Sequence, residues 1–207
     1  MKATTKNAGI SLWGDSVSLE ELYDLTHKCW DSLSITDETL RDILYNFSYD
    51  LRKAYSGARD YDYIEDSSKE RIPIYGVKIN WLLVLLSINY IRYSFAYLET
   101  TKKDQSIIYL LEYYVEKIVN EQFSKTSYFI TNTANQFISE NQENFSPKFL
   151  NAENYFLSLT TKSKRTTELL PILKSLLSLR AMSDEDTLMV SEKILLNNGY
   201  CPETVKW

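Results

Sequence analysis

The sequence predicts a predominantly helical α+β fold: a helical bundle around one buried central helix, with a small antiparallel sheet of about three short strands. First, residues 77–98 form an almost uninterrupted apolar and aromatic stretch. Second, apolar residues recur three and four positions apart over most of the remaining chain, which is typical of amphipathic helices. Third, the segments 59–65 and 71–77 flank a turn-like sequence and have the composition of strands.

The central helix is expected over about residues 80–99. A membrane span needs about 20 apolar residues with few or no charges, and Arg92 interrupts this segment. The longest uncharged run, residues 79–91, matches the ~10–14 residues of a helix buried in a soluble core. The sequence therefore predicts no membrane association and the burial of five side chains: Leu82, Leu85, Leu86, Tyr90 and Tyr93.

The chain before the central helix is predicted to hold a strand and two helices. Residues 8–13 read as a strand that ends at a Gly-Asp turn. Ser18 starts a capping-box pattern that opens a helix over 18–31. An apolar stripe predicts a helix over 36–56, and Gly57 follows where a helix end favours a positive φ.

A hairpin is predicted between the second helix and the central helix. Tyrosines alternate with acids in 59–65, and a second strand follows at 71–77. Pro73 cannot donate to a ladder, so this strand should have an edge or an irregular partner on that side. We expect 8–13 to be the third strand and Asn80 to cap the central helix.

The rest of the chain is predicted to be helical, within a single domain of residues 1–207. Asp104 is expected to cap the next helix, and Thr166 or Thr167 to begin a later one. The polar residues 124–146 are expected to form a further helix, or a linker or mobile segment. The remaining helices are expected over 104–122, 147–160, 167–181 and 184–198.

The composition indicates a cytoplasmic protein with a real core. The net charge of −5 disfavours nucleic acid as a partner, because phosphate neutralisation needs a concentrated basic surface. Two cysteines are too few for a disulfide scaffold, and no signal peptide is visible. Gly-rich phosphate loops are absent, so no cofactor is predicted. The 16 tyrosines suit core packing, which we favour, or interfaces.

Three runs of residues resemble a family of uncharacterised bacterial proteins with no assigned activity. These runs are GISLWGD at 9–15, FSYDLRKAYSG at 47–57 and IYGVKINW at 74–81. The resemblance covers roughly the first half of the chain, and residues 124–207 carry no part of it. It implies a bacterial intracellular protein and assigns no functional residue.

No metal site or catalytic triad is predicted. His27 is the sole histidine, and on a helix its side chain points about 200° away from that of Cys29. Asp60 and Asp62 lie on one strand face, about 7 Å apart, where they could hold Mg²⁺ or act as an acid–base pair. We favour the alternative that they are solvated charges protecting a sheet edge.

Arg92 is a further candidate, because an unpaired guanidinium in an apolar helix is costly. We expect it to meet an acid or a carbonyl, with Asp50 and the hairpin acids as first candidates. It would be a structural ion pair, which we favour, or an anchor for an anion. A compact basic cluster is formed by Lys162, Lys164 and Arg165. It indicates either a solvated connecting segment before a helix or a phosphate-binding site.

The sequence assigns no specific function. These observations favour a non-enzymatic binding or protein-interaction module, whose partner is another protein or a second copy of the chain. The rival is an enzyme or binding protein for an anionic, phosphate-bearing small molecule. Single-stranded nucleic acid binding through 162–165 is a third hypothesis. The residues that would carry the rival function are Asp50, Arg52, Asp60, Asp62 and Arg92.

Overall fold

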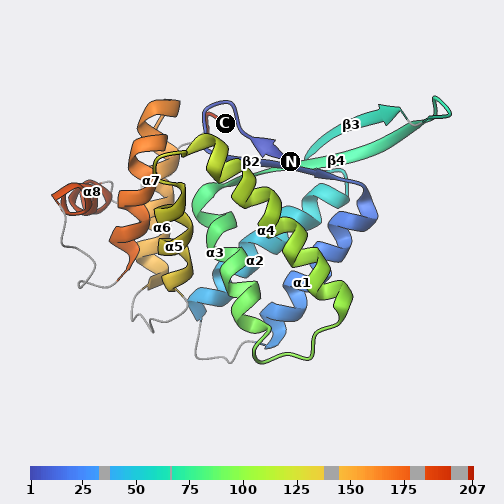
Figure 1. The fold of residues 1–207 in the computed structure, drawn as a ribbon, viewed down its shortest axis with the longest axis horizontal. Coiled ribbons are helices and arrows are strands. Elements are labelled where there is room, and N and C mark those ends of the chain that lie inside the picture. Colours follow the sequence, from blue (N-terminus) through green and yellow to red (C-terminus); the bar gives the residue numbers. More distant parts are fainter. Residues whose placement is uncertain (33–37, 66, 138–144, 178–184, 197–204) are drawn as a thin grey trace.

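The computed structural model describes residues 1–32, 38–65, 67–137, 145–177, 185–196 and 205–207. It confirms the predominantly helical α+β class (Figure 1). The strands are β1 (Lys2–Ala3), β2 (Gly9–Gly14), β3 (Asp60–Glu65) and β4 (Arg71–Asn80). The helices are α1 (Ser16–Ser32), α2 (Glu38–Tyr55), α3 (Trp81–Ser94), α4 (Lys102–Gln122), α5 (Ser127–Gln136), α6 (Phe145–Ser158), α7 (Lys162–Leu176) and α8 (Glu185–Leu196).

The sheet is antiparallel, with strand order β1-β2-β4-β3. It has four strands among the described residues, one more than predicted. The additional strand, β1, pairs with β2 and has only two residues, which is too short to give a sequence pattern. β2 pairs with β4 from Gly9 opposite Asn80 to Gly14 opposite Tyr75. Residues 71–74 of β4 therefore lie beyond the end of β2 and pair with β3 alone. This half of the hairpin projects from the body of the molecule (Figure 1).

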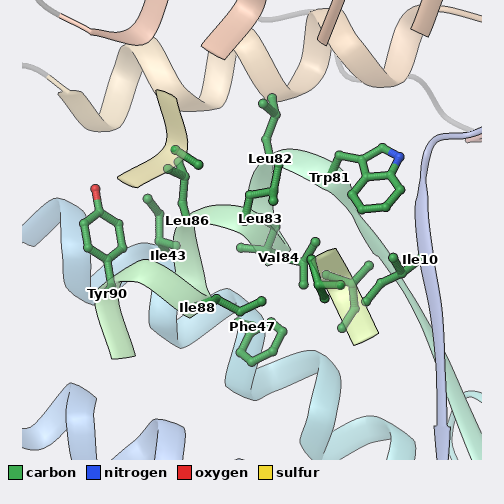
Figure 2. Packing of buried hydrophobic residues seen from close by; sticks show 14 of the residues in the cluster. Ile10, Ile43, Phe47, Trp81, Leu82, Leu83, Val84, Leu86, Ile88 and Tyr90 are labelled. Atoms are coloured by element: carbon green, nitrogen blue, oxygen red, sulfur yellow. The ribbon is translucent and has the colours of Figure 1, made fainter. Parts of the chain in front are cut away.

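Helix α3 forms the centre of the hydrophobic core (Figure 2). Every residue from Trp81 to Ile91 is buried, and Asn80 caps the helix by accepting a hydrogen bond from the N–H of Leu83 at 2.9 Å. Burial of the predicted core leucines and Tyr90 is confirmed. Tyr93 is only half-buried, and the helix ends at Ser94 rather than near residue 99. None of the described helices combines the length and apolarity that a membrane crossing needs.

Two predicted helix caps are wrong by one turn. Asp15, not Ser18, caps α1, because its Oδ1 accepts from the Ser18 N–H at 2.8 Å. Thr101 caps α4 and forms a capping box with Asp104, which was itself expected to be the cap. At the end of α2, Gly57 has the expected positive φ, 75°.

The C-terminal half packs as helices against α3 and each other. α5 fills residues 127–136 of the stretch expected to be a helix or a linker, and its Ile130 is fully buried. α7 begins at Lys162, capped by Thr161, and not at Thr166 or Thr167. Pro171 accordingly lies inside this helix. The expected helix ends at 178–181, 184 and 197–198 lie outside the described residues.

Candidate functional site

Two adjacent surface features contain three of the candidate residues, Asp50, Asp60 and Asp62: the projecting β3–β4 hairpin and a polar cleft at its base. Asp60, the first residue of β3, belongs to both. The hairpin is held by a six-residue ladder from Asp60–Gly76 to Glu65–Arg71. Its tip includes residue 66, which lies outside the described residues.

Large apolar side chains are exposed on the hairpin. The exposed fractions are 50% for Tyr61, 40% for Tyr63, 49% for Ile64 and 39% for Ile72. Because side chains alternate across a strand, these residues lie on both faces. A hairpin that projects beyond its sheet has no layer to cover either face, so this apolar surface meets solvent.

One face of the hairpin is aromatic. The ring of Tyr61 lies 5.0 Å from that of Tyr63 and 5.7 Å from that of Tyr75, measured between centroids. The Arg71 guanidinium lies 4.4 Å from the centroid of the Tyr63 ring. These contacts order the aromatic side chains while leaving their outer surfaces exposed.

The opposite face is acidic and aliphatic. The ladder places Asp62 opposite Ile74, and Ile64 opposite Ile72. Asp60 lies 3.3 Å from Lys78 Nζ, at the base of this face. The hairpin thus has one aromatic face and one face that combines isoleucines with carboxylates.

The hairpin base is fixed to the sheet by a close contact between Trp13 and Gly76. These residues are partners in the β2–β4 ladder. A Cβ on residue 76 would lie 2.6 Å from Trp13 Cδ2, so only glycine lets the indole lie against the strand. Trp13 Nε1 donates a hydrogen bond to Ser11 Oγ at 2.7 Å, which fixes the ring.

The cleft has a volume of about 490 Å³ and lies between α2, β4, α6 and the C-terminal residues. Two ion pairs line it: Arg59 with Asp50, at 2.8 Å, and Lys78 with Asp60. Glu153 on α6 also lines it and accepts a hydrogen bond from Asn80 Nδ2 at 2.7 Å. Tyr49, Asn46, Val77, Leu83, Leu157 and Trp207 complete the lining.

Burial raises the pKa of two carboxyl groups in the cleft. The pKa of Asp50 is raised by desolvation, although Arg59 opposes the shift. The pKa of Glu153 is raised by desolvation and further by the charge of Asp50, against the Asn80 hydrogen bond. Both cations of the cleft already face an acid, so the cleft has little unbalanced positive charge with which to hold an anion.

The structure brings only part of the predicted residue set together. Asp50 and Asp60 share the cleft, whereas Asp62 lies further out on the hairpin, where its Oδ1 accepts the Tyr63 N–H at 2.8 Å. The Arg52 guanidinium lies 5.4 Å from the centroid of the Tyr49 ring.

The prediction that Arg92 pairs with an acid is confirmed, but the candidate partners were wrong. Its Nε lies 3.1 Å from Glu112 Oε1 on α4, and its guanidinium lies 4.7 Å from the centroid of the Tyr109 ring. Asp50 instead pairs with Arg59. Arg92 therefore links α3 to α4 through this ion pair.

The basic cluster at 162–165 is not a connector, because it forms the first turn of α7. Arg165 is fully buried and donates hydrogen bonds to the backbone carbonyls of Lys6, Leu157 and Lys206. Its guanidinium thus joins the N-terminal loop, the end of α6 and the C-terminal residues. The local signal that distinguishes it from its exposed neighbours is helical spacing, because it lies four and seven residues before the buried Leu169 and Ile172 of α7.

The sole histidine lies on the surface of α1. His27 Nδ1 is 3.2 Å from Asp31 Oδ2, and Cys29 is buried in the core. Within the described residues, no group of three or more potential ligands is placed to hold a metal ion.

In the comparison with known families, DUF6904, a domain of unknown function, matches residues 1–195. The chain belongs to this family. The family match extends into α8, so the resemblance is not confined to the first half, as the sequence motifs had suggested. Comparison with curated proteins and with solved structures gave no match.

Proposed function

We propose that this DUF6904 chain is a protein-interaction module whose docking element is the β3–β4 hairpin. The observation that supports the proposal is the projection of a hairpin with large apolar side chains exposed on both faces. Contiguous exposed apolar surface rimmed by charged residues marks interaction sites in soluble proteins. A partner protein that covers the hairpin would bury this surface.

The composition of the hairpin also suits an interface. Tyrosine and arginine are enriched in interface cores, and a tyrosine side chain loses little conformational entropy on binding. The Tyr61–Tyr63 and Arg71–Tyr63 contacts hold these side chains in place before any partner arrives. Such preorganisation lowers the entropic cost of association.

Small-molecule binding in the polar cleft is a second candidate. Because Arg59 and Lys78 are paired with acids, the cleft suits a cationic group better than the anion proposed from the sequence. A thermal-shift comparison of arginine and small amines with phosphate and sugar phosphates tests this. Stabilisation by anions alone would favour the original hypothesis.

A photo-crosslinking residue tests the interaction proposal. It is placed at Ile64 on the hairpin and, as the control, at Val17 on α1, which is exposed to 59%. In cells of the source organism, Ile64 should give a defined adduct that Val17 does not. The protein identified is then purified, and its binding is measured with Tyr61→Ser/Ile64→Ser/Ile72→Ser.

The triple variant should bind the purified partner at least about tenfold more weakly, because interface energy is concentrated in a few aromatic and apolar anchors. Circular dichroism should show an unchanged fold, since all three side chains are exposed. Equal adducts from both positions, or equal affinity of the triple variant, would contradict the proposal.

A further inference from the structure

We propose that the partner docks by adding an extended basic segment as a new strand beside β3. This inference rests on the proposed function of the hairpin. It identifies the occupant by its chemistry: a segment in which Lys or Arg alternates with apolar residues. Strand addition at an exposed sheet edge is a recurring mode of peptide recognition.

The backbone of β3 is open on its outer side. β3 is the last strand in the order β1-β2-β4-β3, and among the described residues no strand pairs with its outer edge. Tyr63 donates its N–H to the side chain of Asp62, and its ladder partner Pro73 has no N–H. The Tyr63 backbone groups therefore face outward, where an incoming strand would pair with the C=O and would replace the Asp62 side chain as the acceptor of the N–H.

The edge is protected from pairing by acids alone. Natural edge strands are blunted by charged side chains, proline or a bulge, and β3, with the sequence DYDYIE, carries three acids and contains neither lysine nor proline. Its charges are all negative. They repel another acidic strand and leave a basic strand as the complementary occupant.

The same charges disfavour a second copy of this chain as the occupant. A pair of β3 strands would place a segment with three acids, Asp60, Asp62 and Glu65, beside an identical acidic segment that offers no basic residue. Like charges across a strand pair are destabilising, whereas opposite charges stabilise it. Among the described residues, Asp60 is the one of these acids with an ion pair, which it forms with the exposed Lys78.

The alternation of β3 specifies the pattern of the partner. Asp60 and Asp62 lie on one face, and Tyr61 and Tyr63 on the other. Residues side by side in a sheet share a face, so basic side chains should lie next to the acids and apolar ones next to the tyrosines. This is the alternating sequence that we propose.

The test uses two short capped peptides, one alternating lysine with valine and one alternating glutamate with valine. Amide NMR shifts of the full-length protein report where each peptide binds. The lysine peptide should shift the β3 amides, slow their hydrogen exchange and lose affinity as salt is added. The absence of β3 shifts at millimolar lysine peptide, or equal shifts by the glutamate peptide, would overturn the proposal.

Two matched variant pairs separate strand addition from contact with side chains. Tyr63→Pro removes the outward N–H, whereas Tyr63→Ala keeps it, so the proline variant should bind the lysine peptide at least about tenfold more weakly than the alanine variant. Asp60→Asn/Asp62→Asn, on the acidic face, should weaken binding roughly fivefold relative to the α4 control Glu116→Gln/Glu121→Gln. Equal affinity of the two Tyr63 variants would overturn strand addition, and equal affinity of the acid variant and its control would overturn the basic occupant.

The result also distinguishes this inference from the proposed function. If Ile64 crosslinks a partner that binds Tyr63→Pro and Tyr63→Ala equally, the hairpin docks through its side chains and strand addition is wrong. If Ile64 gives no specific adduct, the docking function itself fails.

Discussion

Tyr63 lies directly opposite Pro73 in the β3–β4 ladder, at a level where β2 has already ended. The hairpin has a second free edge, on the side of β4 that faces β2. Pro73 has no N–H to donate there, so another strand cannot pair fully with this edge. The two edges of the projecting hairpin therefore differ. The β4 edge is blocked by proline, and the β3 edge is open and acidic.

Pro73→Val should open the β4 edge. Valine restores a backbone N–H and favours strand structure, so we expect a monomer of similar stability, within about 0.5 kcal/mol, that self-associates more readily. Light scattering as a function of concentration measures the association. The control is Ile72→Val on the same strand, and equal behaviour of the two variants would show that Pro73 does not protect the edge.

Arg165→Met should destabilise the fold by about 3 kcal/mol or more, because hydrogen bonds to a charged group contribute about 1.5–3 kcal/mol each. The substitution leaves three backbone carbonyls without their guanidinium donor. Urea unfolding measures the loss, with the exposed neighbour Lys164→Met as control. Equal stability of the two variants would mean that Arg165 does not join the chain segments that it contacts.

Glu153→Gln should stabilise the protein near neutral pH and lose this advantage in acid. Burial raises the folded-state pKa of Glu153 above its ordinary value of 4.5, so the folded state binds the proton more tightly than the unfolded state. The wild type therefore gains stability as pH falls through the folded-state pKa towards 4.5, and the variant does not share this gain. Urea unfolding across this range, with Glu116→Gln as control, measures the difference. A difference in unfolding free energy between the wild type and Glu153→Gln that does not change with pH would contradict this prediction.

Cys29 should be inert while the protein is folded. Burial raises the pKa of its thiol to about 12, and only the thiolate reacts with alkylating reagents. In a Cys201→Ser background at about pH 8, iodoacetamide should modify the folded protein at least about a hundredfold more slowly than the unfolded protein. Mass spectrometry follows the reaction, and similar rates would place the thiol at the surface.

The sequence predicted most of the fold because the signals are local. The apolar run identified α3, helical spacing identified α2 and α4, and alternation identified the hairpin strands. Three helix starts shifted because Asp15, Thr101 and Thr161 each offer a side-chain oxygen that caps as well as that of the residue predicted. Local chemistry does not choose between neighbouring caps.

The candidate site was predicted less well because it depends on tertiary contacts. The sequence shows that Arg92 needs an acid, but only the packing of α4 decides that Glu112 supplies it. The projection of the hairpin follows from the end of β2 at Gly14, which its own residues do not encode. The burial of Arg165 depends on carbonyls from distant parts of the chain.

Amide hydrogen exchange of the full chain, free and with the purified crosslinked partner, tests the central claim that the hairpin is the docking element. The account predicts that the largest new protection appears at residues 60–65 and 71–76 of β3 and β4. Protection confined to other elements, such as α4, with an unchanged hairpin would contradict it.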